Sequence, residues 1–439
     1  MLALFLAATL TGPSSSAPPY VLPIAPGALT ISVVSAGDYV PLGELIPGSY
    51  RMVGVPDGLG AFDNGDGTFT VLMNHETGPD SGAPRAHGAQ GAFVSKWRVR
   101  KSDFAVVRGE DLIQRVVLWN RALHAYNLPA KGVGLANLCS ATFDRATGIF
   151  FSGEETFEGR VFAHLPDGTS YELPRFGHAQ WENAAMHPSA RRTIVVGLDD
   201  ITNGYLYVYV GDKQSSGSPV DRAGLTNGSL YVVRTSGNRF QLQSLGDVSA
   251  QSGASQRALS AAAGGAQWER TEDGAWDPNQ PNDFYFVTTA TFAGRSRLWR
   301  LRFDDLEDPV RGGAIDILLD GTEGPKMMDN LTVRARGDVI IQEDPTGGPA
   351  SYLAKIWRYD PITDRVEVIA EHDPRFFSPG GTLSTDEESS GIIDVSDILG
   401  DGWLLFDVQS HNFIGGEVLQ GGQLLLMHLP SPRRRAVRH

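Results

Sequence analysis

Short runs of apolar and β-branched residues recur along the chain, and most of them end in acidic or amide residues just before a loop. A second run, rich in aromatic residues and arginine, usually follows. The recurring runs cover residues 69–76, 149–155, 193–200, 284–289, 339–344 and 403–411. Runs this short, bounded by Asp-Gly, Asn-Gly and Pro turns, are typical of β-strands and not of helices.

The spacing of these runs predicts a ring of repeated units. About six units lie roughly 50 to 70 residues apart, which is the scale of a β-propeller blade. Radial closure of such blades leaves few exposed strand edges. The sequence therefore predicts an all-β fold, a β-propeller of about six blades with long loop insertions between strands, in one domain over residues 18–429.

The acidic ends of the runs predict a common site. We expect the acid-ending runs to be the innermost strands, which line the central channel and bring their last residues to one mouth. These residues are Glu76, Glu155, Asp200, Glu343 and either Gln409 or His411. Several carboxylates at one point repel one another unless cations neutralise them. The alternative is that each acid is only a solvated residue at a strand end.

The charge of the chain bears on which ligands it can bind. The chain has 439 residues and a formal net charge of −14. This balance argues against nucleic-acid binding, because phosphate backbones are bound by clustered Lys and Arg side chains. An acidic protein that handles an anion needs bound cations to invert its local field.

Cys139 is the only cysteine, so it cannot form an internal disulfide. It is either a small buried hydrophobic residue or a metal ligand. The run after it ends in Glu154 and Glu155, so neighbouring strands would bring a thiol and two carboxylates together. A thiolate suits a transition metal, whereas carboxylates suit calcium.

Further oxygen-bearing residues stand beside predicted strands. Asp329 and Asn330 precede the run 331–333, and Glu387 and Glu388 precede the run 392–394. The second pair lies either in a polar surface loop or in a buried acidic loop that closes the site.

The two ends of the chain differ from the repeats. The apolar start, followed by small residues up to Ala17, predicts a signal peptide over residues 1–17 and a secreted or periplasmic protein. It is too short to cross a bilayer, and we expect no membrane span elsewhere. Residues 430–439 contain four arginines after Pro430 and predict a basic, disordered tail.

Six short motifs, in their order along the chain, resemble the PhoX-type alkaline phosphatase family. They are 74–76 (Asn-His-Glu), 137–139 (Asn-Leu-Cys), 153–155 (Gly-Glu-Glu), 181–183 (Trp-Glu-Asn), 198–200 (Leu-Asp-Asp) and 329–331 (Asp-Asn-Leu). The resemblance implies an exported six-bladed propeller that hydrolyses phosphate esters at a cluster of iron and calcium. It also implies that Cys139 is an iron ligand, that Glu155 belongs to the same cluster, and that Glu182 matches a glutamate of the family.

The sequence and the resemblance together give a set of candidate residues. The candidate metal ligands are Glu76, Cys139, Glu154, Glu155, Glu182, Asp199, Asp200, Asp329, Asn330, Glu343, Asp344, Glu387 and Glu388. By resemblance a metal-bound oxide or water supplies the nucleophile. Arg160, just after the Glu-Glu run, is either a clamp for the phosphate or a solvated arginine of a strand. The chain shows no Gly-x-Ser-x-Gly elbow and no Walker loop.

Two functions remain open at this point. The first is a metal-dependent phosphatase that acts as a monomer on a small phosphorylated substrate. The second is a non-catalytic propeller that holds calcium for structure and binds a ligand or partner. A lactonase-like hydrolase with one calcium in its channel would leave Cys139 without a role.

Overall fold

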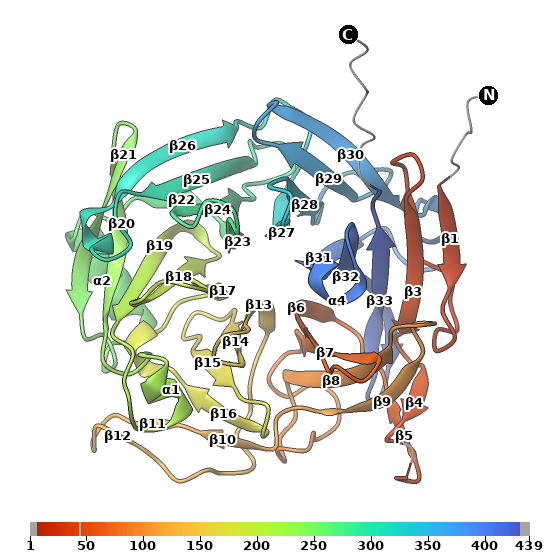
Figure 1. Cartoon of the computed structure of the whole chain (residues 1–439), viewed down its shortest axis with the longest axis horizontal. Helices are drawn as coiled ribbons and strands as arrows, with labels where there is room; N and C mark the ends of the chain where they lie inside the picture. Colours follow the sequence, from red (N-terminus) through yellow and green to blue (C-terminus); the bar gives the residue numbers. More distant parts are fainter. Residues whose placement is uncertain (1–6, 44, 431–439) are drawn as a thin grey trace.

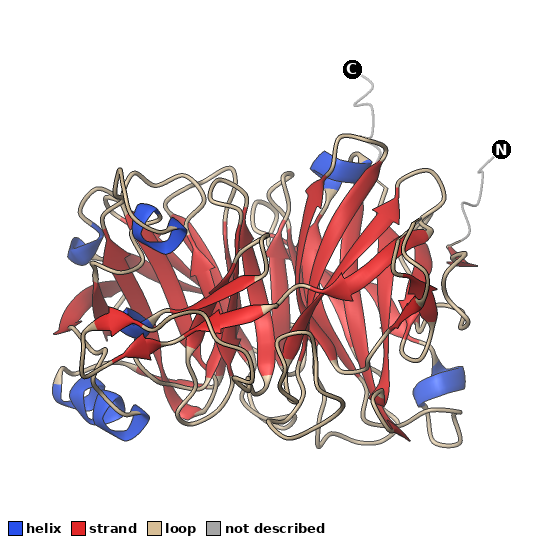
Figure 2. Ribbon diagram, turned by 90° about the horizontal axis from the view of Figure 1, so that it is seen from below, coloured by secondary structure: helices blue, strands red, loops and turns tan. Residues whose placement is uncertain are grey.

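The computed structural model describes residues 7–43 and 45–430 and shows a β-propeller of six blades around a central channel (Figure 1). The predicted fold class is confirmed. Seen from the side, the blades form one disc, and the few short helices lie in loops at its faces and edges (Figure 2). No helix in the described part of the chain is long and apolar enough to cross a membrane.

The first three blades follow one another from residue 56 to residue 246. Blade one consists of β6 (Pro56–Asp63), β7 (Thr68–His75), β8 (Phe93–Arg100) and β9 (Val106–Asp111). Blade two consists of β13 (Leu138–Asp144), β14 (Ile149–Glu154), β15 (Val161–His164), β16 (Thr169–Glu172) and the parallel β10 (Arg115–Val117). Blade three consists of β17 (Trp181–Met186), β18 (Thr193–Asp199), β19 (Thr202–Gly211), β20 (Ser229–Ser236) and β21 (Arg239–Gly246).

The other three blades complete the ring. Blade four consists of β23 (Thr271–Trp276), β24 (Asp283–Thr288), β25 (Arg297–Phe303) and β26 (Gly313–Leu319), and β26 also pairs with β21. Blade five consists of β27 (Met328–Val333), β28 (Val339–Glu343), β29 (Lys355–Asp360), β30 (Arg365–His372) and β2 (Val21–Pro23). Blade six consists of β31 (Glu388–Asp394), β32 (Trp403–Gly415), β33 (Leu419–His428), β3 (Leu29–Ser35) and β1 (Ala8–Thr11).

The remaining elements lie in the connections. The small strands are β4 (Tyr39–Pro41) paired with β5 (Ser49–Arg51), β11 (Trp119–Asn120) paired with β12 (Ala125–Tyr126), and β22 (Gln267–Glu269) on β19. The helical segments are α1 (Pro219–Arg222), α2 (Gly253–Ala262), α3 (Pro374–Phe377), α4 (Ser396–Leu399) and the 3₁₀ turns η1 (Pro174–Phe176) and η2 (Pro309–Arg311).

The ring is closed by strands from both ends of the chain. β3 pairs antiparallel with β33, so that Leu29 lies opposite His428, and β1 pairs parallel with β3. The segment predicted as a signal peptide includes β1, an exposed edge strand. Its removal would leave β3 on blade six. Residues 1–6 of that segment and residues 431–439 of the predicted tail lie outside the described residues.

The assignment of the innermost strands from the sequence is wrong by one strand. The strands that contact one another in a ring around the channel are β6, β13, β17, β23, β27 and β31 (Figure 1). The acid-ending runs correspond to the second strand of each blade, such as β14 and β18, which have buried residues on both faces. Burial on both faces gives these second strands the strongest apolar runs.

The innermost strands are less apolar because they are crowded near the axis. A Cβ atom on Gly58 would lie 2.4 Å from the backbone nitrogen of Ala141 on the neighbouring blade. Close approach of two backbones requires glycine, which weakens the strand signal in the sequence.

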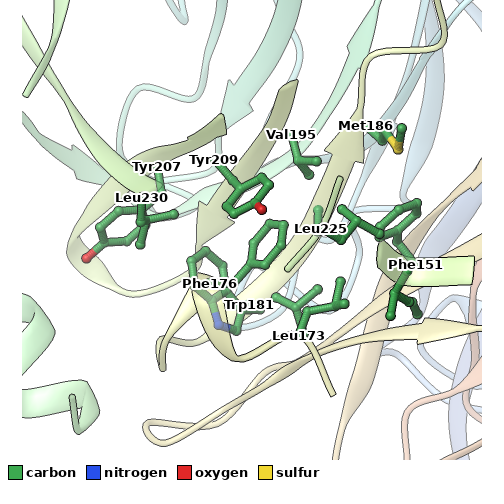
Figure 3. Packing of buried hydrophobic residues seen from close by; sticks show 14 of the residues in the cluster. Phe151, Leu173, Phe176, Trp181, Met186, Val195, Tyr207, Tyr209, Leu225 and Leu230 are labelled. Carbon is green, nitrogen blue, oxygen red and sulfur yellow. The ribbon is translucent and has the colours of Figure 1, made fainter. Parts of the chain in front are cut away.

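The core lies between the faces of adjacent blades. Between blades two and three, Trp181 packs with Phe176 and Tyr207, and Phe151 and Tyr209 belong to the same cluster (Figure 3). These contacts hold β17 rigidly, so the residue after Trp181 has a fixed position at the channel.

Candidate metal centre

One backbone hydrogen bond recurs at the same point of five blades. The N–H group of the residue after the second strand donates to the carbonyl oxygen of a residue just before the innermost strand. The pairs are Glu76 to Val55 (2.9 Å), Glu155 to Asn137 (2.8 Å), Asp200 to Gln180 (2.8 Å), Thr289 to Arg270 (3.0 Å) and Asp344 to Met327 (3.1 Å). Each of these five blades thereby brings the start of its innermost strand and the end of its second strand to the same mouth of the channel.

A register shift follows the start of every innermost strand. In β13, for example, the shift lies between Leu138 and Ala141, and β6, β17, β23, β27 and β31 have their own. Such bulges bend a strand and re-aim its side chains. The second residue of the strand stands at this point in the first five blades, as Asp57, Cys139, Glu182, Glu272 and Asp329.

The backbone just before these residues adopts an unusual conformation in four blades. Val55, Asn137, Arg270 and Met327 have φ values of 52°, 45°, 63° and 42°. Positive φ is a genuine outlier for a β-branched residue such as Val55. Strain of this kind concentrates at functional sites, where the surrounding fold maintains it.

The side chains meet in three overlapping groups, which we call the acidic cluster. The groups are Asp57 with Glu76 and Cys139, Cys139 with Glu155 and Glu182, and Glu182 with Glu272 and Asp329. Within each group the ligand atoms lie within 4.8 Å of one another. Cys139 and Glu182 each belong to two groups, so the three groups form one continuous track of ligand atoms.

Burial and mutual repulsion make this cluster unfavourable without cations. Five carboxyl groups of the cluster have pKa values raised well above the ordinary ones, mainly by burial and further by the neighbouring carboxylates. They are Asp57, Glu155, Glu182, Glu272 and Asp329. Burial and the nearby carboxylates likewise raise the pKa of the Cys139 thiol. Carboxylate oxygens are ligands for calcium and a thiolate is a ligand for iron, so the donor set fits both.

A pH prediction follows from the acidic cluster. Burial and neighbouring Glu388 raise the pKa of Glu76 from 4.5 to about 7 and that of Asp344 from 3.8 to about 6. A raised folded-state pKa contributes stability below the unfolded value and loses it as pH rises through the folded value. We expect the melting temperature of the metal-free protein to fall between about pH 4.5 and pH 7, because these acids then ionise without cations.

Scanning calorimetry in EDTA and in excess calcium would test this prediction. Calcium binds the ionised form, so the gap between the two melting temperatures should widen as pH rises. Two parallel curves would contradict the prediction.

Arg270 is the arginine that reaches the acidic cluster. Its Nε and Nη2 atoms donate to the two carboxylate oxygens of Asp200 at 2.9 and 2.7 Å, and Nη2 also lies 2.7 Å from Glu272. Its side chain is 30 % exposed. It is therefore held at the edge of the cluster and still faces solvent.

Arg160 occupies a different place. Its Nε and Nη2 atoms lie 2.6 and 2.7 Å from the two carboxylate oxygens of Glu154, which also accepts the N–H of Ala136. The structure therefore places the predicted clamp, together with Glu154, in an ion pair outside the three groups.

At the ends of three second strands, the two adjacent acidic residues point in different directions. Glu155, Asp200 and Asp344 approach the acidic cluster, whereas Glu154, Asp199 and Glu343 point into their own blades. Successive residues of a strand face opposite sides. Asp199 accepts from Arg257 at 2.8 Å, and Glu343 accepts from Tyr352 at 2.9 Å and from Trp357 at 2.8 Å.

The remaining predicted residues divide between the cluster and its surroundings. Glu388 adjoins the cluster, since it raises the pKa of Asp57, Glu76 and Asp329. Glu387 instead accepts the N–H of Ala354 at 3.1 Å. Asn330 donates to Ser140 at 3.0 Å and lies beside Asp329.

Sequence reasoning missed Asp57, Glu272 and Arg270. The signal that could have found the two acids is a carboxylate directly or shortly before glycine at a strand start, as in Asp57-Gly58 and Glu272-Asp273-Gly274. In the sequence these resemble ordinary turn signals.

Comparisons with known proteins agree with this fold. No family model and no curated protein matches the chain by sequence. Among solved structures, PhoX of Pseudomonas fluorescens in complex with vanadate, a transition-state analogue, has a TM-score of 0.72 at 14% identity, over 97% of this chain and 98% of that chain. This similarity shows a shared fold.

Two further structures are less similar. The periplasmic gluconolactonase PpgL of Pseudomonas aeruginosa has a TM-score of 0.43 at 11% identity, over 90% of this chain and 93% of that chain. A chain of a nidogen/laminin complex has a TM-score of 0.41 at 10% identity, over 82% of this chain and 98% of that chain.

Proposed function

We propose that the protein is a metal-dependent phosphatase that hydrolyses phosphate esters at the acidic cluster. The observation that carries this proposal is the continuous track of three ligand groups joined by Cys139 and Glu182, with Arg270 at its edge. The fold is shared with PhoX, whose complex contains a transition-state analogue. Such analogues bind far more tightly than substrates to the site where the reaction occurs.

The three groups differ in the cation that suits them. The two groups that share Cys139 contain a thiol and suit iron, whereas Glu182, Glu272 and Asp329 offer only oxygen and suit calcium. When bound, these cations would polarise the phosphoryl oxygens and offset the charge that develops on them.

The protein's own part is to bind and orient the phosphate. Asp200 and Glu272 fix the direction of the Arg270 guanidinium through its Nε and Nη2 atoms, and its Nη1 atom is left to donate to a phosphate oxygen. Because the Arg270 side chain is 30 % exposed, a small phosphorylated substrate can reach it from solvent. We propose that the protein acts as a monomer after export, in the periplasm or outside the cell.

Replacement of Cys139 by serine tests the proposal. We expect purified wild-type protein to contain iron and calcium and to hydrolyse p-nitrophenyl phosphate. Cys139→Ser should lose its iron and keep calcium, with activity lowered about a hundredfold or more, because a serine hydroxyl stays protonated and cannot replace the anionic thiolate ligand. Elemental analysis and initial rates measure both effects.

Ser140→Ala, on the same strand, serves as the control and should keep its iron. Wild-type protein with stoichiometric calcium, no iron and no turnover would overturn the proposal. That result would favour a calcium-binding propeller without catalysis.

A further inference from the structure

The channel contains a cavity at the end of the innermost strands away from the acidic cluster. It has a volume of about 620 Å³ and is lined by residues of all six innermost strands. Its apolar wall includes Leu59, Phe143, Met186, Trp276, Leu331 and Ile393. Ligand pockets commonly have about 300–1,000 Å³ and an apolar lining with a few polar groups.

A polar layer separates this cavity from the acidic cluster. Asn183 donates to Asp273 at 2.6 Å, and Asp273 also accepts the N–H of Leu331 at 3.0 Å. Asn183 and Asp273 line the cavity, whereas the preceding residues, Glu182 and Glu272, belong to the cluster. The cavity is therefore a separate site.

The polar groups of the cavity are mostly acidic. Four aspartates line it, namely Asp144, Asp273, Asp394 and Asp397, and Arg145 is its one cationic lining residue in the described part of the chain. Arg145 is already paired with Asp397 at the exposed mouth. Asp144 is buried, and its Oδ1 atom has no hydrogen-bond partner among the described residues.

We propose that this cavity binds a small apolar cation, such as a primary alkylamine. The apolar wall favours an aliphatic body, because its burial removes apolar surface from water. The excess of carboxylates favours a positive head group, and their attraction is strengthened in a site with little water. A neutral ligand would leave this excess of negative charge uncompensated, and an anion would be repelled.

Isothermal titration of the full chain in saturating calcium tests the proposal. The probes are hexylammonium and its neutral counterpart, hexanol. We expect hexylammonium to bind once per chain and hexanol to bind about tenfold more weakly, which corresponds to one charge interaction of about 1.4 kcal/mol. Asp144→Asn should remove this difference and keep the turn, because its other oxygen still accepts the N–H of Thr147.

Ala335→Trp, at an exposed position of the mouth, should weaken both ligands. Asp397→Asn provides a second charge variant at an exposed site. Equal affinity for the two ligands, no binding of hexylammonium under any condition, or binding of hexylammonium only after calcium is removed with EDTA would each overturn the proposal. The last outcome would place the amine in the acidic cluster.

Discussion

Glu182→Gln is expected to release bound metal and to lower kcat/KM for p-nitrophenyl phosphate about a thousandfold. Glu182 is the one carboxylate that belongs to two of the three ligand groups, so its loss affects two cation positions at once. Glutamine has nearly the same shape but no charge, and an amide oxygen is a weaker ligand for a cation. Metal content and steady-state kinetics on the same preparation measure the effect.

Glu387→Gln is the matched control for this variant. Glu387 is also buried, and one of its oxygens accepts a backbone N–H, but it lies outside the three groups. We expect this control to keep its metal and most of its activity. Similar losses in both variants would show that the effect is structural and would contradict the proposed site.

Arg270→Lys is expected to lower kcat/KM about a hundredfold while metal content stays unchanged. Lysine keeps the charge but cannot hold Asp200 through two parallel donors and donate to a phosphate at the same time. If Arg270 stabilises the transition state more than the bound substrate, the loss appears mainly in kcat. Arg270 also bridges Asp200 and Glu272, so the melting temperature must be measured beside the rates.

Arg160→Lys separates the two arginines. Arg160 is engaged by Glu154 outside the acidic cluster, and we expect its replacement to leave kcat/KM within about threefold of the wild type. A larger loss in Arg160→Lys than in Arg270→Lys would reverse the assignment of the phosphate clamp.

The sequence predicted the propeller because its second strands carry a strong signal. Runs such as β14 and β18 are buried on both faces and end in acids at a constant point of the repeat. Those acid pairs led to Glu155 and Asp200. Which acid of each pair faces the channel depends on the residue at which the strand ends. A shift of one residue would turn the other acid toward the channel.

Three residues of the candidate site, Asp57, Glu272 and Arg270, could not be predicted in this way. Asp57 and Glu272 lie on innermost strands that contain glycine and bulges, because neighbouring blades approach closely at the axis. These strands lack a clean alternation of apolar and polar residues. Arg270 was hidden for another reason, since its place at the cluster depends on a left-handed backbone that the sequence does not reveal.

The closure of the ring by β3 and β33 has a kinetic consequence. Contacts between residues about 400 positions apart are costly in loop-closure entropy and slow the folding of a chain. The N–H of Tyr20, for example, is bonded to the side chain of Gln423, 403 residues away. Blade six is therefore expected to assemble last, after the complete chain has been synthesised.

The candidate metal centre lies across this late seam. Gln409 of blade six donates to Glu76 and Asp57 of blade one, at 3.0 and 3.2 Å. A cation bound by Asp57, Glu76 and Cys139 would thus lie where the two ends of the ring meet. Metal capture during refolding should report the final closure step, and its rate should follow the slowest folding phase.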